Sequence, residues 1–451
     1  MARGKKKETL TPEERLQVAL VPEGEQPYKV PRNWCWVRLE LLLRSSKEKT
    51  EEFSDADLKY VGLEHMQKDG GIVAYDSAER VKSLKNVFHP QQILYGKLRP
   101  YLNKHDIATF DGVCSTDILV FNATSVTIPK FVNFFLDQDT FIEYAVSNSK
   151  GINLPRVSES VVLDAKCPLP PIYEQHRIVD RIESLFAKLD EAKQKAQDAL
   201  DSFETRKAAI LHRAFTGELT AQWRKEHGVG MESWEARTST QLFEYVTSGS
   251  RGWAKYYADN GDIFVRMGNL NHGTIELDLS DIQYVNLPGQ TEGQRTKLQK
   301  NDILISITAD IGMVGIVREM EQNAYINQHI ALARPTAKDN AEFLAWYLIS
   351  DVGLQQMRNK QRGATKIGLG LDDIRSLELL IPTREEQDEV VYILDNLLAN
   401  EQQAKEVAEG VLEQIDLIKK AILARAFRGE LGTNDPSEES AVELLKQISS
   451  C

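Results

Sequence analysis

Two stretches of this chain are nearly the same: Lys207-Ala-Ala-Ile-Leu-His-Arg-Ala-Phe-Thr-Gly-Glu-Leu219 and Lys419-Lys-Ala-Ile-Leu-Ala-Arg-Ala-Phe-Arg-Gly-Glu-Leu431. They lie 212 positions apart, and ten of their thirteen positions are identical. The same offset pairs Pro170 with Pro382 and Glu174-Gln175 with Glu386-Gln387, without insertion or deletion. Because this period is far longer than that of a solenoid repeat, it predicts one domain-plus-helix unit that is written twice.

The composition is that of a multi-domain globular protein. At 451 residues the chain is too long for one core, and two to three domains are expected. No run of eighteen apolar residues is present, and the basic start Met1–Lys7 is not followed by the apolar core of a secretory signal, so we expect no membrane segment. The four cysteines are scattered, which fits a reducing cytoplasm and excludes a zinc ribbon.

The net charge of −12 is unusual for a protein that binds nucleic acid. The acidic excess is concentrated in residues 383–432, with 6 basic and 11 acidic side chains, and in residues 433–451, with 1 and 4. This distribution argues against a strong non-specific DNA binder that acts alone. It does not argue against a sequence-specific DNA-binding protein that relies on the basic surface of a partner.

Both copies show the same order of expected elements. Strands are predicted at 117–121, 302–307 and 329–333. Amphipathic helices are predicted at 129–148 and 340–359, the first with these aromatic side chains inward: Phe131, Phe134, Phe135, Phe141 and Tyr144. A further short helix is expected to begin at Thr11-Pro12-Glu13-Glu14 and to continue to about Leu20.

Each unit is followed by a helical segment with apolar residues at heptad spacing. The first seam is Ile178, Ile182, Leu185, Leu189, Ala192, Ala196, Ala199, Phe203 and Ile210; the second is Val390, Leu394, Leu397, Ala404, Ala408, Val411, Ile415, Ile418 and Ile422. Such seams predict coiled coils of about 60 Å, at 1.5 Å per residue. They fit an oligomerisation stalk, or two equal helices that pair antiparallel within the chain and act as a ruler. Glu401 interrupts the second seam.

The predicted fold class is therefore α+β. Two mixed α/β domains are separated by two long helices that form an intramolecular antiparallel coiled coil, with an internal pseudo-two-fold repeat. The predicted parts are an N-terminal helix and arm (1–30), a first domain (31–170), a central helical spacer (171–224), a second domain (225–382), a C-terminal helical spacer (383–432) and an acidic tail (433–451).

Several phrases in register with the repeat match a known family. A tryptophan-containing entry, Pro31-Arg-Asn-Trp34-Cys-Trp-Val, leads to a unit that ends in Cys167-Pro-Leu-Pro-Pro171. The next helix opens Glu174-Gln-His-Arg-Ile-Val and closes Ala214-Phe-Thr-Gly-Glu-Leu-Thr-Ala-Gln-Trp-Arg224, and the series restarts at Ser233-Trp234. Over essentially its whole length the chain resembles the DNA-specificity (S) subunit of type I restriction–modification systems. The second helix lacks the Pro-Leu-Pro-Pro run.

The resemblance implies a role for each part. The two domains would be target recognition domains for double-stranded DNA, each reading one half of a split, asymmetric sequence. The helices would set the spacing of the half-sites and bind two methyltransferase (M) subunits, with two restriction/translocase (R) subunits in the complex. S-adenosylmethionine, ATP and Mg²⁺ would be held by those partners, which carry out adenine methylation and restriction.

No catalytic arrangement is evident in the chain itself. The nearest string to a methyltransferase loop, Leu169-Pro-Pro-Ile-Tyr173, has Leu where Asn or Asp is required, and it is interpreted as a rigid hinge. Gly368-Leu-Gly370 lacks the context of a nucleotide-binding loop, and no phosphate-binding Gly-x-x-x-x-Gly-Lys sequence occurs. We therefore expect a non-catalytic subunit with no metal and no cofactor of its own.

DNA contacts are expected from loops rich in Arg, Lys, Asn and aromatic residues. In the first unit the candidates are Lys82, Lys85, Lys97, Arg99, Tyr101, Asn103, Lys104, Asn148, Lys150, Asn153 and Arg156. In the second they are Arg251, Lys255, Tyr256, Arg266, Asn269, His329, Arg358, Lys360, Arg362 and Lys366. Any one of them can instead be a solvated surface charge, and His329 can be a strand-end residue. The repeat makes the loops at Gly151 and Gly363 equivalent, and glycine there would allow a phosphate to approach the backbone. The rival interpretation is a coiled-coil scaffold that binds no DNA.

Overall fold

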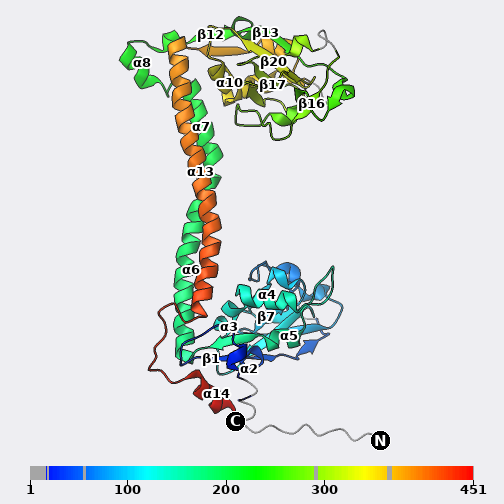
Figure 1. The fold of residues 1–451 in the computed structure, drawn as a ribbon, viewed down its shortest axis with the longest axis vertical. Coiled ribbons are helices and arrows are strands. Elements are labelled where there is room, and N and C mark those ends of the chain that lie inside the picture. The colour runs from blue at the N-terminus through cyan, green and yellow to red at the C-terminus, as the bar shows by residue number, and fades with distance from the viewer. Residues whose placement is uncertain (1–16, 18–19, 54–56, 289–292, 363–367, 450–451) are drawn as a thin grey trace. The chain divides into compact units, whose positions relative to one another are not determined.

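The computed structural model describes residues 17, 20–53, 57–288, 293–362 and 368–449. The chain forms two compact units, one of residues 1–196 and 410–451 (unit 1) and one of residues 197–409 (unit 2) (Figure 1). The helix predicted from Thr11 to about Leu20 lies almost wholly outside the described residues. Within them, no helix is long and apolar enough to cross a membrane.

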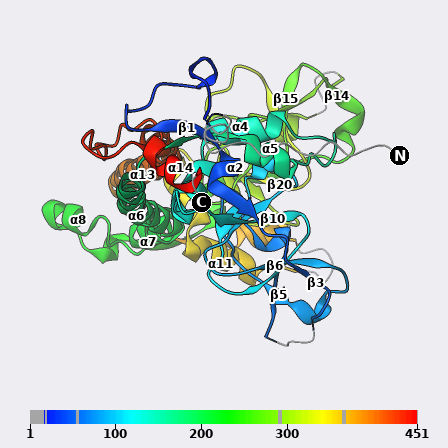
Figure 2. The same cartoon turned by 90° about the horizontal axis from the view of Figure 1, so that it is seen from below.

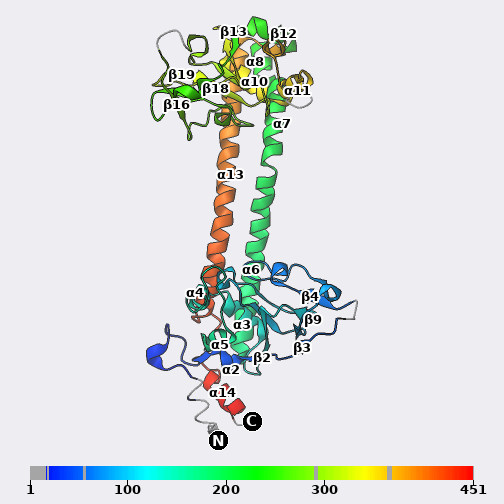
Figure 3. The same ribbon diagram turned by 90° about the vertical axis from the view of Figure 1, so that its right-hand side faces the viewer.

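Unit 1 contains three sheets. The antiparallel pair β1 (Cys35–Arg38) and β11 (Lys166–Leu169) joins the entry to the exit of the globular part. A four-stranded antiparallel sheet has the order β2 (Leu43–Ser45), β10 (Ile118–Ala123), β7 (Ile93–Gly96), β8 (His105–Ile107). A five-stranded sheet has the order β3 (Lys49–Thr50), β6 (Lys85–Phe88), β9 (Gly112–Cys114), β4 (Lys59–Val61), β5 (Asp76–Ser77), and it lies on the side of unit 1 away from α6 and α14 (Figures 2 and 3).

Unit 2 repeats this architecture. Its antiparallel pair is β12 (Glu235–Thr238) with β21 (Glu378–Ile381), and its central sheet has the order β13 (Phe243–Ser248), β20 (Ile330–Pro335), β17 (Ile303–Ser306), β18 (Val314–Ile316). The third sheet has the order β14 (Tyr257–Ala258), β16 (Gln283–Val285), β15 (Asp262–Val265), β19 (Ala324–Ile326). The parallel pair β15·β19 corresponds to β4·β9 in unit 1. The repeat predicted from the sequence is thus a repeat of fold.

Besides these sheets, the described residues form short helices. Unit 1 has α2 (Leu39–Leu42), α3 (Pro129–Leu136), α4 (Asp139–Ser147), α5 (Glu159–Asp164) and α14 (Ala441–Ser449). Unit 2 has α8 (Ala221–His227), α9 (Ser239–Leu242), α10 (Ala341–Ile349), α11 (Asp351–Asn359) and α12 (Leu371–Arg375). The predicted strands at 117–121, 302–307 and 329–333 are confirmed as β10, β17 and β20, within one or two residues at each end.

The two amphipathic helices predicted at 129–148 and 340–359 are each broken in two, so the prediction of single helices was wrong. The breaks fall at repeat-equivalent residues, Gln138 (φ −70°, ψ 131°) and Ser350 (φ −66°, ψ 162°). An extended residue cannot continue the i to i−4 hydrogen bonds of a helix. Ser350 also starts the next helix, because its Oγ accepts a hydrogen bond from Gly353 N at 3.4 Å.

The phenylalanine of each repeated phrase packs into the core of one unit. In unit 1 the ring of Phe427 lies 5.0 Å from that of Phe131 on α3, between ring centroids. In unit 2 the ring of Phe215 lies 5.4 Å from that of Phe343 on α10. Phe215 and Phe427 are repeat equivalents, as are Phe131 and Phe343, so the two phrases perform the same packing role. Of the aromatic residues predicted to face inward, Phe131, Phe135 and Phe141 are buried, and Phe134 and Tyr144 are half-buried.

Long helices pair antiparallel within each unit. In unit 1, α6 (Ile172–Asp201) pairs with the last part of α13 (Arg384–Ala426), because Asp190 binds Lys419 while Lys193 lies 3.5 Å from Asp416. In unit 2, α7 (Phe203–Phe215) pairs with the first part of α13, where Arg206 binds Glu401 at 2.8 Å. Glu401, the exception in the predicted seam, therefore has a cationic partner on the facing helix.

The predicted seams are only partly buried. Ile178, Ile182, Val390, Leu394 and Ile415 are buried as expected. The seam positions that are exposed instead are Ala199, Ala404, Val411 and Ile418. The first helical segment breaks at Ser202, between α6 and α7, whereas α13 is one helix of 43 residues. Because a straight helix has 3.6 residues per turn, its buried face drifts away from a strict 3.5-residue repeat, and Leu423 and Ala426 are buried further along α13.

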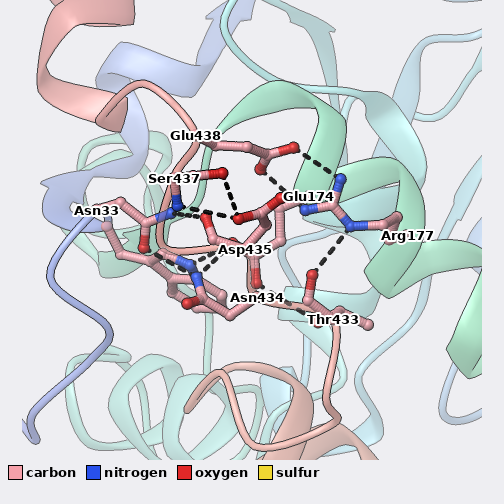
Figure 4. A network of polar contacts seen from close by, with 9 residues as sticks. Asn33, Glu174, Arg177, Thr433, Asn434, Asp435, Ser437 and Glu438 are labelled. Atoms are coloured by element: carbon pink, nitrogen blue, oxygen red, sulfur yellow. Dashed lines mark hydrogen bonds and ion pairs between the residues drawn. The ribbon is translucent and has the colours of Figure 1, made fainter.

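A buried glutamate lies in the first turn of each long helix. In unit 1, Glu174 accepts hydrogen bonds from Trp34 Nε1 at 2.7 Å and from Asn434 Nδ2 at 2.8 Å (Figure 4). In unit 2, its repeat equivalent Glu386 accepts from Thr220 Oγ1 at 2.7 Å and from Arg224 NH1 at 2.6 Å. A negative side chain is favoured at a helix N-terminus. Asn434 in unit 1 and Thr220 and Arg224 in unit 2 are donors that follow a repeated phrase, whereas Trp34 belongs to the entry of unit 1.

The segment predicted as an acidic tail packs on unit 1. Arg177 donates two hydrogen bonds of 2.8 Å to the carboxylate of Glu438 (Figure 4). Ala441 N donates to Asn33 O at 2.9 Å. Ala441 and Leu445 of α14 are buried. The acidic side chains of this segment therefore help to hold the end of the chain against the start of α6.

Candidate nucleic-acid interface

Both units build the same backbone arrangement at one end of the central sheet. In unit 1, Lys97 N donates to Asp117 O at 2.8 Å, and Val157 N donates to Lys97 O at 3.0 Å. In unit 2 the equivalent bonds run from Ile307 N to His329 O at 3.0 Å and from Leu369 N to Ile307 O at 2.9 Å. We call this end of the sheet, together with two loops, the platform of each unit. The loops follow β7 and α4 in unit 1, and β17 and α11 in unit 2.

The glycine-bearing loops are also equivalent. Lys150 and Arg156 exchange two backbone hydrogen bonds of 2.9 Å, and their repeat equivalents Arg362 and Gly368 exchange two of 3.1 and 3.0 Å. Gly151 has φ +103°, and a Cβ there would lie 3.0 Å from Leu154 O, so glycine is required. Gly363 and Lys366 lie outside the described residues.

A second backbone feature is shared by the two platforms. Arg99 has φ +54° and Ala309 has φ +61°, so a residue other than glycine adopts the left-handed region at the same place in both loops. In unit 1 this turn is held by Arg99 N, which donates to Pro155 O at 2.7 Å. Left-handed residues other than glycine are uncommon, and they persist only where the surrounding structure fixes them.

The platform of unit 1 gathers most of the candidate residues of that unit. Arg99, Tyr101, Lys150, Asn153 and Arg156 are exposed, and Lys97 is half-buried. Arg156 NH2 lies 2.9 Å from Asp117 Oδ1, an ion pair that the sequence did not predict. Lys97, Lys150 and Arg156 line one shallow cleft, together with apolar side chains of the neighbouring loop.

Two lysines that sequence reasoning missed extend this basic cleft. Lys47 and Lys49 line a second cleft that shares Lys97 and Arg156 with the first, and the pairing of β3 with β6 brings Lys49 opposite Asn86. Their signal in the sequence, Ser45-Ser-Lys-Glu-Lys49, is weak, and only the sheet order connects it with loops fifty to a hundred residues later. Lys85 lies on the same strand pair and binds Ser83, and Lys82 is exposed nearby in sequence.

Besides Asp117, the carboxylate of Glu159 lies among these cations. Glu159 accepts hydrogen bonds from Lys47 Nζ at 2.7 Å and from Ser45 Oγ at 2.6 Å. Partial burial raises the pKa of Glu159, but the hydrogen bonds from Lys47 and Ser45 and the charge of Lys97 lower it overall. Glu159 is therefore ionised at neutral pH, and it offsets part of the positive charge of the cleft.

The side chains of four candidates in the two units have hydrogen-bond partners within the protein. Asn103 is 1% exposed, and its Nδ2 lies 3.1 Å from His105 Nε2. Asn269 is 4% exposed and donates to Asp278 O at 2.8 Å. Lys104 Nζ donates to Leu63 O at 2.7 Å, and Asn148 Nδ2 donates to Tyr144 O at 2.8 Å. Asn103 and Asn269 are thus corrected from surface contacts to buried residues that fix turns.

In unit 2 the candidates are more dispersed. Arg251, Lys255 and Arg358 are exposed, Tyr256 and Lys360 are half-buried, and Lys255 Nζ lies 4.7 Å from the centre of the Tyr256 ring. Arg266 is paired with Asp281 at 3.1 Å and Arg362 with Asp373 at 2.7 Å. His329 is half-buried on the platform, where its Nδ1 lies 2.6 Å from Thr308 Oγ1.

Metal-ligating and thiol groups were the other candidate functional groups among the described residues. Among them, no three His, Cys, Asp or Glu side chains are grouped so that they could hold a metal ion. Burial raises the pKa of Cys35 and of Cys114 to about 12, so both thiols are protonated at neutral pH.

Comparisons with known proteins agree with this architecture. Residues 231–409 match the family model of the type I restriction modification DNA specificity domain. The specificity subunit of the type I restriction enzyme EcoDI from Escherichia coli is 33% identical over 201 residues, which cover 44% of this chain and only 45% of that protein. The specificity subunit of EcoBI, also from Escherichia coli, is 26% identical over 323 residues, 67% of this chain and 68% of that protein.

A solved structure extends the likeness to the fold of most of the chain. The HsdS subunit from Thermoanaerobacter tengcongensis superimposes with a TM-score of 0.65 at 22% identity, covering 90% of this chain and 99% of that one. At this identity the likeness concerns the fold alone. Residues 231–409 thus match the type I restriction modification DNA specificity domain, and the chain is similar in sequence to type I restriction enzyme specificity subunits and in fold to an HsdS subunit.

Proposed function

We propose that this specificity subunit recognises a bipartite, asymmetric sequence in double-stranded DNA and directs adenine methylation and restriction by partner subunits. The observation that carries the proposal is that one chain contains two platforms whose described residues make equivalent backbone hydrogen bonds and carry different side chains. Two identical readers would recognise a symmetric sequence, whereas two different readers recognise two different half-sites. Basic and polar side chains at a cleft suit contacts to phosphates and base edges.

The chemistry is assigned to the partners. Two M subunits would supply the S-adenosylmethionine site and much of the basic surface, since this chain carries a net charge of −12. Two R subunits would use ATP and Mg²⁺. The chain itself would act as a non-catalytic reader in the cytoplasm, without a cofactor of its own.

The test is to sequence the methylated bases of a host with and without this gene, M subunit genes being present in both. The expected result is one split motif that is methylated only when the gene is present. A control host carries the gene with a stop codon near its start, so that the chain is not made and no split motif is expected. An identical methylation pattern with and without the gene would contradict the proposal and favour the coiled-coil scaffold.

A further inference from the structure

One pair of repeat-equivalent positions that lie side by side carries charges in the platform of unit 1 and none of the same kind in the platform of unit 2. In unit 1, Asp117 and Arg156 form an ion pair, with NH2 to Oδ1 at 2.9 Å and side chains 29% and 54% exposed. In unit 2 the same positions hold His329 and Gly368. Each pair is attached to the same hydrogen-bonded backbone, because Asp117 O and His329 O accept the equivalent bonds from Lys97 N and Ile307 N.

The ion pair of unit 1 is built to present a guanidinium. The backbone of Arg156 is fixed on both sides, by Lys150 and by the bridge to Leu98. Asp117 pairs with NH2 of the half-exposed guanidinium of Arg156. A guanidinium has five N–H donors, so this one carboxylate leaves several of them available to a ligand. An exposed pair of this kind adds little to folding stability, so stability is a weak reason for it.

Unit 2 lacks both charges at this place. His329 Nδ1 lies 2.6 Å from Thr308 Oγ1 and its Nε2 lies 2.7 Å from Gln328 Nε2, so both ring nitrogens have partners within unit 2. Among the described residues, a Cβ at Gly368 would meet only Ile307 O, at 3.5 Å, and the φ of Gly368 is not in the left-handed region. The described residues therefore do not require glycine at position 368.

We propose that Arg156, oriented by Asp117, is a specificity-determining residue that reads a guanine in the half-site of unit 1, and that His329 and Gly368 are the corresponding positions of unit 2. The proposal rests on the proposed function, because it names the base that one platform recognises. A guanidinium that donates to guanine O6 and N7 is the commonest specific contact of proteins with DNA bases. Lys97 and Lys150, which line the same cleft, are placed to contact phosphates on either side of that base.

The experiment uses the full chain in complex with M subunits and a randomised pool of duplex DNA, with methylated molecules sequenced. For the unaltered protein, the half-site of unit 1 contains one fixed guanine. Arg156→Lys keeps the charge but loses the two-point contact, so the preference for guanine at that single position falls about tenfold or more, while the other half-site is unchanged. Asp117→Asn relaxes the same position by a smaller factor.

A matched control is available in the same unit. Arg38 and Asp164 form an ion pair that lies outside the clefts lined by Arg156, and Arg38→Lys should leave the motif unchanged. The complementary test transplants the pair: His329→Asp with Gly368→Arg should create a preference for guanine at one position of the half-site of unit 2. Melting temperatures establish whether each variant is folded.

The outcomes separate the proposal from the function on which it rests. If the unaltered complex methylates without any sequence preference, the proposed function fails. If it shows a split motif and folded Arg156→Lys leaves every position as it was, Arg156 is not a reader and the proposal is overturned. Equal weakening on all sequences would make Arg156 a phosphate contact and would also overturn it. A folded transplant that leaves the half-site of unit 2 unchanged overturns the equivalence of the two positions.

Discussion

At the scale of single residues, the repeat-equivalent glutamates Glu174 and Glu386 show how one position is satisfied in two ways. Glu386 is fully buried and is paired with Arg224, whose side chain is only 8% exposed. Glu174 is equally buried but accepts from the neutral donors Trp34 and Asn434. The two helix starts are therefore stabilised by different chemistry.

At the start of α13, Arg224→Met should lower the free energy of unfolding by roughly 3–5 kcal/mol, because it leaves the buried carboxylate of Glu386 without its cation. The double variant Arg224→Met with Glu386→Gln should recover a large part of this loss. Denaturant unfolding of the three proteins checks the prediction, and equal stability of the single variant and the unaltered chain would contradict it.

For Glu174, whose donors are neutral, we expect the free energy of unfolding to depend on pH. Burial raises the pKa of Glu174, although the hydrogen bonds from Trp34 and Asn434 lower it in part. Since the folded state holds the proton more tightly than the unfolded state, the carboxyl favours folding at low pH, and this contribution is lost as the pH rises through the folded-state pKa. Glu174→Gln, which stays neutral, should therefore gain stability relative to the unaltered protein as the pH rises from 4 to 7. A stability difference that does not change with pH would contradict this account.

At the scale of elements, the sequence predicted the helices and strands well and their interruptions poorly. Strands β10, β17 and β20 were evident as apolar runs, and the heptad spacing indicated the long helices. The breaks at Gln138, Ser350 and Ser202 were missed, because neither Gln nor Ser prohibits a helix and tertiary packing decides the matter. In the candidate interface, the loops could be predicted from their basic residues, but the pairing of Asp117 with Arg156 and the approach of Lys47 and Lys49 depend on sheet order.

The drift of the buried face along α13 gives a test with an internal control. Ile415 is 3% exposed, whereas Ile418, also assigned to the seam from the sequence, is 43% exposed. Ile415→Ala should cost about 2–5 kcal/mol through lost burial and a residual cavity, and Ile418→Ala should change stability by less than about 0.5 kcal/mol. Thermal unfolding of both variants compares them. Equal losses of stability in the two variants would contradict the drift and support burial of both residues in a strict heptad seam.

At the scale of the whole molecule, the acidic balance of the chain predicts dependence on partners. The purified chain alone should bind duplex DNA weakly and with little sequence preference, because its net charge of −12 opposes the approach of phosphates. Addition of two M subunits should produce sequence-specific binding that weakens as salt rises. Titrations of labelled DNA at two salt concentrations check this, and tight specific binding by the lone chain would contradict it.

The two helical segments carry the remaining prediction, that they fix the gap between the half-sites. Four residues inserted into both α6 and the facing part of α13 add about one turn, or about 6 Å, to a paired helix. At about 3.4 Å per base pair, this should lengthen the unspecified gap by one or two base pairs and leave both half-sites unchanged. The matched control is a four-residue insertion after Gly228, an exposed left-handed residue that ends α8 outside the paired helices, and it should leave the gap as it was. The test is to determine the methylated motif of each variant. An altered half-site with an unaltered gap would show that the helices do not set the spacing of the half-sites. A longer gap with the same half-sites would show that spacing and base recognition reside in separate parts of the chain.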